Sequence, residues 1–174
     1  HKDVYSVRQS DQRFRDLADS APVMIWETNG SGENVFFNKT WLDFRGRDFD
    51  AERRIRRKDE IHPDDADRYQ TVTDSAMQMR QCFRLEYRIK SRDQSYRWIL
   101  DTGYPMYDAQ GVFAGFVGSA IDITERRKIE AEGEEWRRRY QAAVEASRQL
   151  LLDWNPETQE VKYGGNLEQI LGYS

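Results

Sequence analysis

The chain has 174 residues, 33% of them charged, and its 27 Lys and Arg stand against 31 Asp and Glu for a formal net charge of −4. This length allows one complete domain of ordinary size and a remainder. Aromatic residues make up 13% of the chain. That is too many large apolar side chains for a disordered tail, so we expect a small core rich in aromatics. The near balance of charge argues against nucleic acid as a partner.

Membrane, secretion and metal signals are all missing from the sequence. No stretch approaches the roughly 18–20 uninterrupted apolar residues of a membrane helix, and no apolar segment typical of a signal peptide follows the N-terminus. Cys82 is the single cysteine, and no Cys/His cluster has zinc spacing. We therefore expect a cytoplasmic segment without metal or membrane contact, whose parent protein could still be membrane-attached elsewhere.

The first half of the chain predicts a helix, a hairpin and a charged stretch. Helical spacing begins after Ser10 and stops at Pro22. Residues 23–28 and 34–37 are typical of two strands joined by a turn. Residues 45–60 are mostly charged and carry no clear periodicity. Their basic run, 53–58, is flanked by acidic residues, so it indicates a solvated helix, with regulated nucleic-acid contact as the alternative.

The second half begins with a helix and continues as an antiparallel meander. Pro63, followed by two carboxylates, predicts a helix start at residues 62–65, with an end near Arg80. Residues 83–90 then alternate apolar and charged side chains, which is typical of a strand with one buried face. Strands over 96–106 and 112–123 complete the meander.

From residue 124 the composition changes to that of a charged helix. It carries a narrow apolar seam of two to three heptads, which predicts a homodimer through a marginal coiled coil. The seam consists of Ile129, Trp136, Tyr140 and Ala143. The remaining tail aligns without a gap to the start of the chain, with Arg139 placed under Arg13, and shares its order of elements. We interpret the tail as the start of a second copy of the same fold.

Six motifs occur along residues 11–127 in a characteristic order. They are Ser20-Ala21-Pro22-Val23-Met24-Ile25-Trp26, Phe37-Asn38-Lys39-Thr40-Trp41-Leu42-Asp43-Phe44-Arg45-Gly46-Arg47, Ile61-His62-Pro63-Asp64-Asp65, Leu85-Glu86-Tyr87-Arg88, Tyr96-Arg97-Trp98-Ile99-Leu100-Asp101 and Gly118-Ser119-Ala120-Ile121-Asp122-Ile123-Thr124-Glu125-Arg126. This order resembles the PAS domain with its C-terminal PAC motif, which is common in bacterial sensor proteins.

The resemblance implies an α+β fold, a five-stranded antiparallel sheet with helices over one face, followed by a linker helix. The expected organisation is an N-terminal tail (1–10), a PAS/PAC domain (11–123), the linker helix (124–146) and the start of a second, truncated PAS domain (147–174). The resemblance does not identify a ligand. The cofactor therefore stays unknown, with none, a flavin or another small molecule all open.

A ligand pocket above the sheet is one hypothesis, and ordinary core packing is its alternative. Alternation on the last strand, together with the resemblance to flavin-binding relatives, turns Phe116, Gly118 and Ala120 inward, and the two small residues would leave room. The candidate walls are Phe37, Trp41, Met77 and Leu85. Cys82 starts a strand instead of lying in the helix motif of flavin photochemistry, and His62 at a helix start is a weak candidate for haem.

The exit from the last strand carries the residues that we expect to transmit a signal. In the family this junction, here Asp122, Ile123 and Thr124, connects the sheet to the following helix. Thr124 is predicted to N-cap the linker, with Glu125 near its positive end. An ordinary helix cap without regulation is the alternative.

These features together predict a sensory module instead of an enzyme, because no catalytic constellation is present. The predicted function is signal transduction in a multidomain bacterial sensor, a two-component histidine kinase, through the linker to adjacent PAS and output domains. The alternative is a ligand-free dimerisation module of a diguanylate cyclase or phosphodiesterase.

Overall fold

The computed structural model describes residues 12–151, with side chains to residue 145, so the predictions for 1–10 and 152–174 lie outside this part. The chain divides into two compact units, one ending at Glu125 and one starting at Arg126, and each is described by itself. After a helix over residues 12–20, the elements are β1 (Met24–Thr28), β2 (Asn34–Phe37), α2 (Lys39–Arg45), α3 (Phe49–Arg54), the 3-10 helix η1 (Arg57–Glu60), α4 (Pro63–Met79), β3 (Phe83–Lys90), β4 (Tyr96–Tyr107), β5 (Phe113–Asp122) and α5 (Thr124–Leu151).

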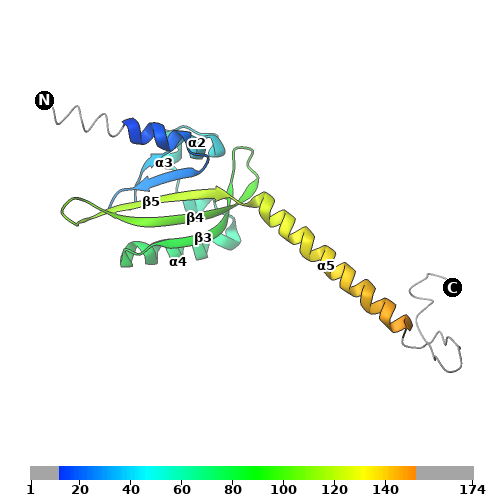
Figure 1. The fold of residues 1–174 in the computed structure, drawn as a ribbon. Helices are drawn as coiled ribbons and strands as arrows, with labels where there is room; N and C mark the ends of the chain where they lie inside the picture. Colours follow the sequence, from blue (N-terminus) through cyan, green and yellow to red (C-terminus); the bar gives the residue numbers. More distant parts are fainter. Residues whose placement is uncertain (1–11, 152–174) are drawn as a thin grey trace, which may run out of the picture. The chain divides into compact units, whose positions relative to one another are not determined.

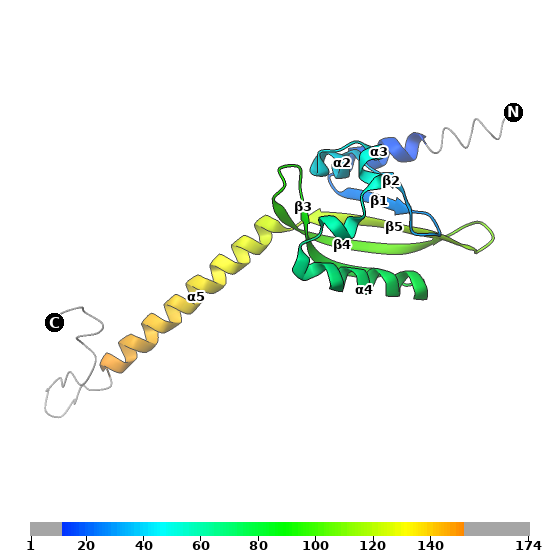
Figure 2. The ribbon, with the colours of Figure 1, turned by 180° about the vertical axis from the view of Figure 1, so that it is seen from behind.

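The strands form one five-stranded antiparallel sheet, as predicted, and their order is β2-β1-β5-β4-β3. The strands β3, β4 and β5 are neighbours in the sheet in the same order as in the chain. The hairpin of β1 and β2 adds to this meander through β1, which pairs with β5 so that Trp26 lies opposite Gly118 and Met24 opposite Ala120. Figure 1 shows the strands in front, and Figure 2 shows α2, α3 and α4 on the other side of the sheet. The helices therefore cover one face.

A buried asparagine fixes how the first elements meet. Asn38 is fully buried and is the N-cap of α2. Its side-chain oxygen accepts from the backbone N–H groups of Ile25 and Trp41, and its amide nitrogen donates to the carbonyls of Ala18 and Val23. Because every bond to this side chain comes from a different stretch of backbone, Asn38 joins the helix over 12–20, β1 and α2.

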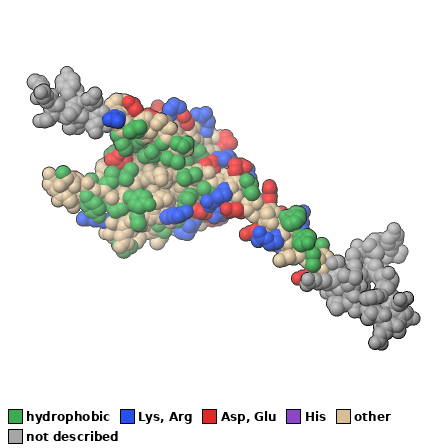
Figure 3. All heavy atoms as spheres, in the orientation of Figure 1, with side chains coloured by type: hydrophobic (Ala, Val, Ile, Leu, Met, Phe, Trp, Pro, Cys, Tyr) green, Lys and Arg blue, Asp and Glu red, His purple; other side chains and the backbone are tan. Residues whose placement is uncertain are grey.

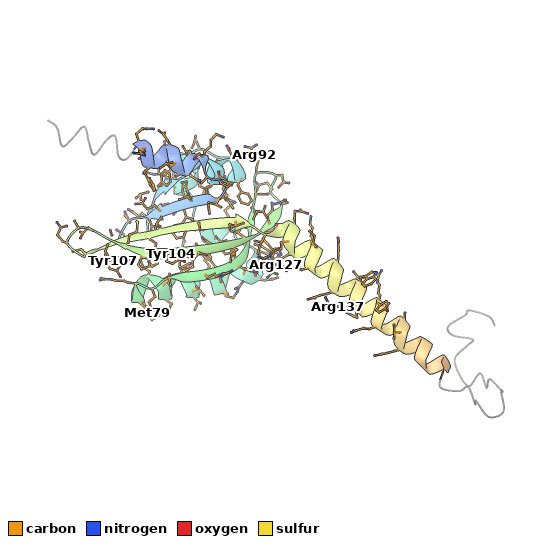
Figure 4. All side chains as sticks on the ribbon, viewed as in Figure 1. Met79, Arg92, Tyr104, Tyr107, Arg127 and Arg137 are labelled. Atoms are coloured by element: carbon orange, nitrogen blue, oxygen red, sulfur yellow. The ribbon has the colours of Figure 1, made fainter. Side chains whose placement is uncertain are left out.

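The core lies between the sheet and the helices and is rich in aromatics, as the composition indicates. Trp26, Trp41 and Tyr87 are each at most 3% exposed. The opposite face of the sheet is also partly apolar: hydrophobic side chains gather on the face in Figure 3, and Tyr104 of β4, labelled in Figure 4, is 56% exposed.

The second unit is described only through α5. This helix continues to Leu151, five residues beyond the predicted end of the linker at 146. In the part of the chain that the structure describes, no helix is both long and apolar enough to cross a bilayer.

Candidate functional site

A cleft of about 830 Å³ opens between the sheet and the helical side of the first unit. Its sheet side carries Trp26, Phe83 and Phe116, and its far walls come from α4 and from the segment of α3 and η1. Two of the seven predicted pocket residues, Met77 and Phe116, line it.

The other five predicted pocket residues lie outside the lining of this cleft. They are Phe37, Trp41, Leu85, Gly118 and Ala120, all of them buried. The room expected above Gly118 is filled, because a Cβ there would lie 2.2 Å from the Trp26 ring. Strand alternation does turn residues 116, 118 and 120 inward, but the indole of the neighbouring strand takes the space.

Sequence reasoning missed a buried ion pair beside the cleft. Arg57 has a side chain only 12% exposed, and its Nη1 lies 3.4 Å from Oδ2 of Asp101, which is fully buried. The prediction that residues 53–58 are solvated is therefore wrong at Arg57. The guanidinium carbon lies 5.0 Å from the ring centre of Trp26 and 4.6 Å from that of Trp41, so aromatic faces favour the cation.

Asp101 is the acceptor at the centre of this cluster. Its two carboxylate oxygens accept from Trp26 Nε1 and the Tyr87 hydroxyl, each at 2.8 Å. Burial raises the pKa of Asp101 above its ordinary value, although Arg57 and both hydrogen-bond donors oppose that shift. The signal for this residue was in the sequence, since a carboxylate at residue 101 shares the inward face of a strand with Ile99.

Burial also disfavours the charged form of Arg57, but its neighbours outweigh that effect. Tyr69, Tyr87 and Asp101 raise the pKa of Arg57 above its ordinary value, so the side chain stays a cation. Its Nη2 is buried and makes no hydrogen bond, and it is the one such side-chain atom in the part of the chain described.

A second buried network holds the segment that the sequence left unassigned. Glu52 of α3 accepts from Trp41 Nε1 and Arg45 Nε, both at 3.0 Å, and from Arg47 at 3.3 Å. Arg45 and Arg47 also bind Glu60 of η1, and Arg45 donates to the Lys90 carbonyl. These pairs attach α2, α3 and η1 to the end of β3, and so position the wall of the cleft that carries Arg57.

The predicted junction is tied to β4 by side-chain and backbone bonds. Asp122 Oδ1 accepts from the Thr124 backbone N–H at 2.9 Å, Thr124 Oγ1 accepts from Trp98 N–H at 2.9 Å, and Ile123 N–H donates to the Trp98 carbonyl at 2.8 Å. Thr124 is thus the first helical residue, and its hydroxyl binds the neighbouring strand. The predicted capping role therefore falls to Asp122, which stands two residues earlier and can reach the free N–H.

The Asp122 carboxylate gives the junction a pH dependence. Burial alone would raise the pKa of Asp122. Hydrogen bonds from Thr124 and Arg97 lower it by more than burial raises it, so the pKa of Asp122 lies below its ordinary value. A depressed pKa means that the stabilisation is present above about pH 4 and is lost as pH falls through the folded value. Asp122→Asn should therefore lower the free energy of unfolding at pH 7, and the difference from wild type should shrink below pH 4. Urea unfolding from pH 7 to 3 measures this, and a difference independent of pH would contradict it.

The seam residues of α5 are exposed. Ile129, Trp136 and Tyr140 are 69%, 68% and 58% exposed, Ala143 is exposed too, and the rings of Trp136 and Tyr140 stack at 5.5 Å. They form an apolar stripe on an otherwise charged helix.

The two residues weighed for cofactor chemistry have other surroundings. His62 is the N-cap of α4, where its Nδ1 accepts from the Asp64 N–H at 3.3 Å, and its ring meets Tyr96 edge-on. Cys82 is exposed just before β3. Within residues 12–151, no group of three or more His, Cys, Asp or Glu is placed to hold a metal ion.

Comparison with known proteins agrees with this geometry. The model of the PAS fold family matches residues 35–120. Protein y4lL of Sinorhizobium fredii is 38% identical over 127 residues, which are 73% of this chain and 15% of that protein. The two-component sensor PprA of Pseudomonas aeruginosa is 27% identical over 148 residues, 83% of this chain and 16% of PprA. The chain thus spans a small part of the length of these curated relatives.

A solved structure shares the fold. The sensory box histidine kinase/response regulator of Burkholderia thailandensis superposes with a TM-score of 0.56 at 23% identity, over 75% of this chain and 98% of that one. The five-stranded sheet, the helices on one face and the family match define the class, a PAS domain. This chain carries a PAS sensory module, and the family match includes no catalytic domain.

Proposed function

We propose that this PAS module relays a change in its cleft to the linker helix α5, as part of a longer bacterial sensor histidine kinase. The observation that carries the proposal is the junction, where Asp122 and Thr124 join the end of β5 and the start of α5 to Trp98 of β4. A rearrangement of the sheet would move these bonds, and they hold the first turn of the helix. The name of PprA, a two-component sensor, supports the choice of a kinase as the parent.

The proposal is tested by removing the junction bonds in the full-length parent protein. Asp122→Ala with Thr124→Ala should change basal autophosphorylation and abolish its response to the physiological stimulus, while the domain stays folded by circular dichroism. Asp108 provides the matched control, because its carboxylate accepts from two backbone N–H groups in the turn at the other end of β5. Asp108→Ala should leave regulation intact. Unchanged regulation in the double variant would refute the relay.

A homodimer through α5 is a second proposal, supported by the exposed stripe of Ile129, Trp136 and Tyr140. Covering three such side chains in a partner helix would remove apolar area from water, and a short seam predicts a weak dimer. Trp136→Glu should make the chain monomeric in sedimentation equilibrium at concentrations where the wild type dimerises. Glu134→Gln, on the same helix but outside the seam, is the control. A wild-type chain that stays monomeric at every concentration would contradict this proposal.

A further inference from the structure

The walls of the cleft are strongly basic. Five cationic side chains line it against two acidic ones, Glu33 and Asp74. The cationic residues are Arg53, Arg54, Arg56, Arg57 and Lys58. Lys58 has an exposed partner, Asp67, at 3.7 Å. A concave site of one sign raises the local concentration of ions of the other, so the cleft favours anions.

The floor of the same cleft is aromatic. Trp26 stacks on Phe83 at 6.0 Å, and Phe83 lies 6.1 Å from Phe116. Phe49, Tyr69 and Met77 add apolar surface at the sides. Sites for small molecules combine such an apolar body with a few placed polar groups, and about 830 Å³ is ample for a molecule of one or two rings.

Arg57 stands where the basic wall meets this floor, and its donors are not all used. Its contact with Asp101 is 3.4 Å long, beyond the 2.7–2.9 Å of strong charge-assisted bonds. The Asp101 oxygens are already bonded to Trp26 and Tyr87 at 2.8 Å, and Nη2 of Arg57 makes no hydrogen bond of ordinary geometry, although Tyr69 also interacts with the guanidinium. A buried donor without a partner is costly. A carboxylate that enters the inner end of the cleft would supply the missing acceptor in the planar geometry that guanidinium favours.

We propose that the cleft binds an organic anion, a carboxylate on an aromatic or apolar body, with Arg57 as the residue that recognises the carboxylate. This inference rests on the proposed sensory function, since it names the class of ligand that the module detects. It also suggests a route to the junction. Asp101 pairs with Ala120 of β5, two residues before Asp122, so a ligand that takes Arg57 from Asp101 changes the charge balance beside the strand that ends at the relay.

The test uses the 174-residue chain and matched probes that differ in charge. Isothermal titration calorimetry compares 2-naphthoate with its neutral amide, 2-naphthamide, and benzoate, octanoate and indole-3-acetate extend the panel. We expect at least one carboxylate to bind, and its amide to bind at least about tenfold more weakly, which equals 1.4 kcal/mol. Equal affinity for acid and amide, or no binding by any carboxylate, would overturn the inference.

Variants assign the binding to Arg57. Arg57→Met should lose the carboxylate signal, while Arg54→Met removes the same charge from an exposed position on the cleft and should change affinity by less than about threefold. Because Arg57→Met leaves Asp101 buried without its cation, Arg57→Met with Asp101→Asn is the second variant, expected to fold and to bind no carboxylate. Equal losses in the Arg54 and Arg57 variants would indicate general attraction only and refute recognition by Arg57.

The two proposals fail separately. The Asp122→Ala, Thr124→Ala variant should bind the carboxylate as wild type does, because neither residue lines the cleft. If no carboxylate binds but this variant still disrupts kinase regulation, the proposal of an anion ligand is refuted and the proposal of a relay through the junction is retained. If binding is normal but regulation is insensitive to the junction, the relay falls and the ligand class stands.

Discussion

Glu52→Ala should destabilise the domain by about 3–5 kcal/mol, because it removes one of the two carboxylates bound to the buried guanidinium of Arg45 and leaves Glu60 as the remaining one. The Arg45 side chain is 2% exposed and that of Glu52 is 6% exposed, so water cannot replace the lost partner. Trp41 Nε1 loses its acceptor in the same variant. A fall of about 10 °C or more in Tm is expected for a domain of this size, measured by thermal unfolding and by urea titration.

Asp43 on the neighbouring helix is the control for this variant. It pairs with Lys39, but both side chains are more than half exposed, so Asp43→Ala should cost at most about 1 kcal/mol. Glu52→Gln separates charge from shape, since an amide oxygen can still accept from Trp41. A loss in Glu52→Ala no larger than that in Asp43→Ala would show that the buried network contributes little.

The sequence predicts elements that depend on local patterns, and it does not predict those that depend on contacts between distant residues. The strand at Phe83–Lys90 was predicted because alternation is a local property of neighbouring residues, and the PAS motifs fixed the order of the elements. The stretch from Arg45 to Glu60 could not be assigned, because its structure depends on ion pairs between residues 7 to 15 positions apart and on a carbonyl of β3. A charged side chain is normally solvated, and no local sequence pattern indicates which charged side chains of this stretch are buried in ion pairs.

The candidate pocket shows the same limit. The small residue at position 118 leaves space above the sheet, but strand alternation does not say which side chain fills that space. Trp26 does so from β1, more than ninety positions away in the chain. Arg57 was hidden in a basic run, and its partner Asp101 lies 44 residues further on. Its three exposed neighbours, Arg53, Arg54 and Arg56, fit the solvated interpretation.

Trp41 connects the two buried networks. Its indole nitrogen donates to Glu52, and its ring faces the Arg57 guanidinium. The network that holds α3 and η1 therefore also holds the aromatic surface under the cation of the cleft.

Asp101→Ala should be of similar size to the Glu52 variant, with a loss of about 3–5 kcal/mol in the free energy of unfolding. The substitution removes the acceptor of both Trp26 Nε1 and the Tyr87 hydroxyl, and it removes the counter-charge of Arg57. Asp101 is fully buried, so water does not reach these groups to replace it. Asp67→Ala is the control, because Asp67 is 99% exposed and pairs with Lys58 at the surface, so its loss should stay below about 1 kcal/mol.

A double-mutant cycle separates the charge pair from the hydrogen bonds. Arg57→Met and Asp101→Asn each leave one buried charge without its partner, whereas the double variant leaves none, so it should be less destabilised than the sum of the two single variants. The pKa of Asp101 is raised in the folded protein, so the carboxylate takes up a proton more readily there than in the unfolded chain. Acidification toward that pKa should therefore relieve the cost of Arg57→Met, and urea unfolding of this variant at pH 7 and pH 5 measures the effect. If the destabilisation of the double variant equals the sum of the two single variants, Arg57 and Asp101 do not stabilise each other. The 3.4 Å contact would then contribute no interaction energy.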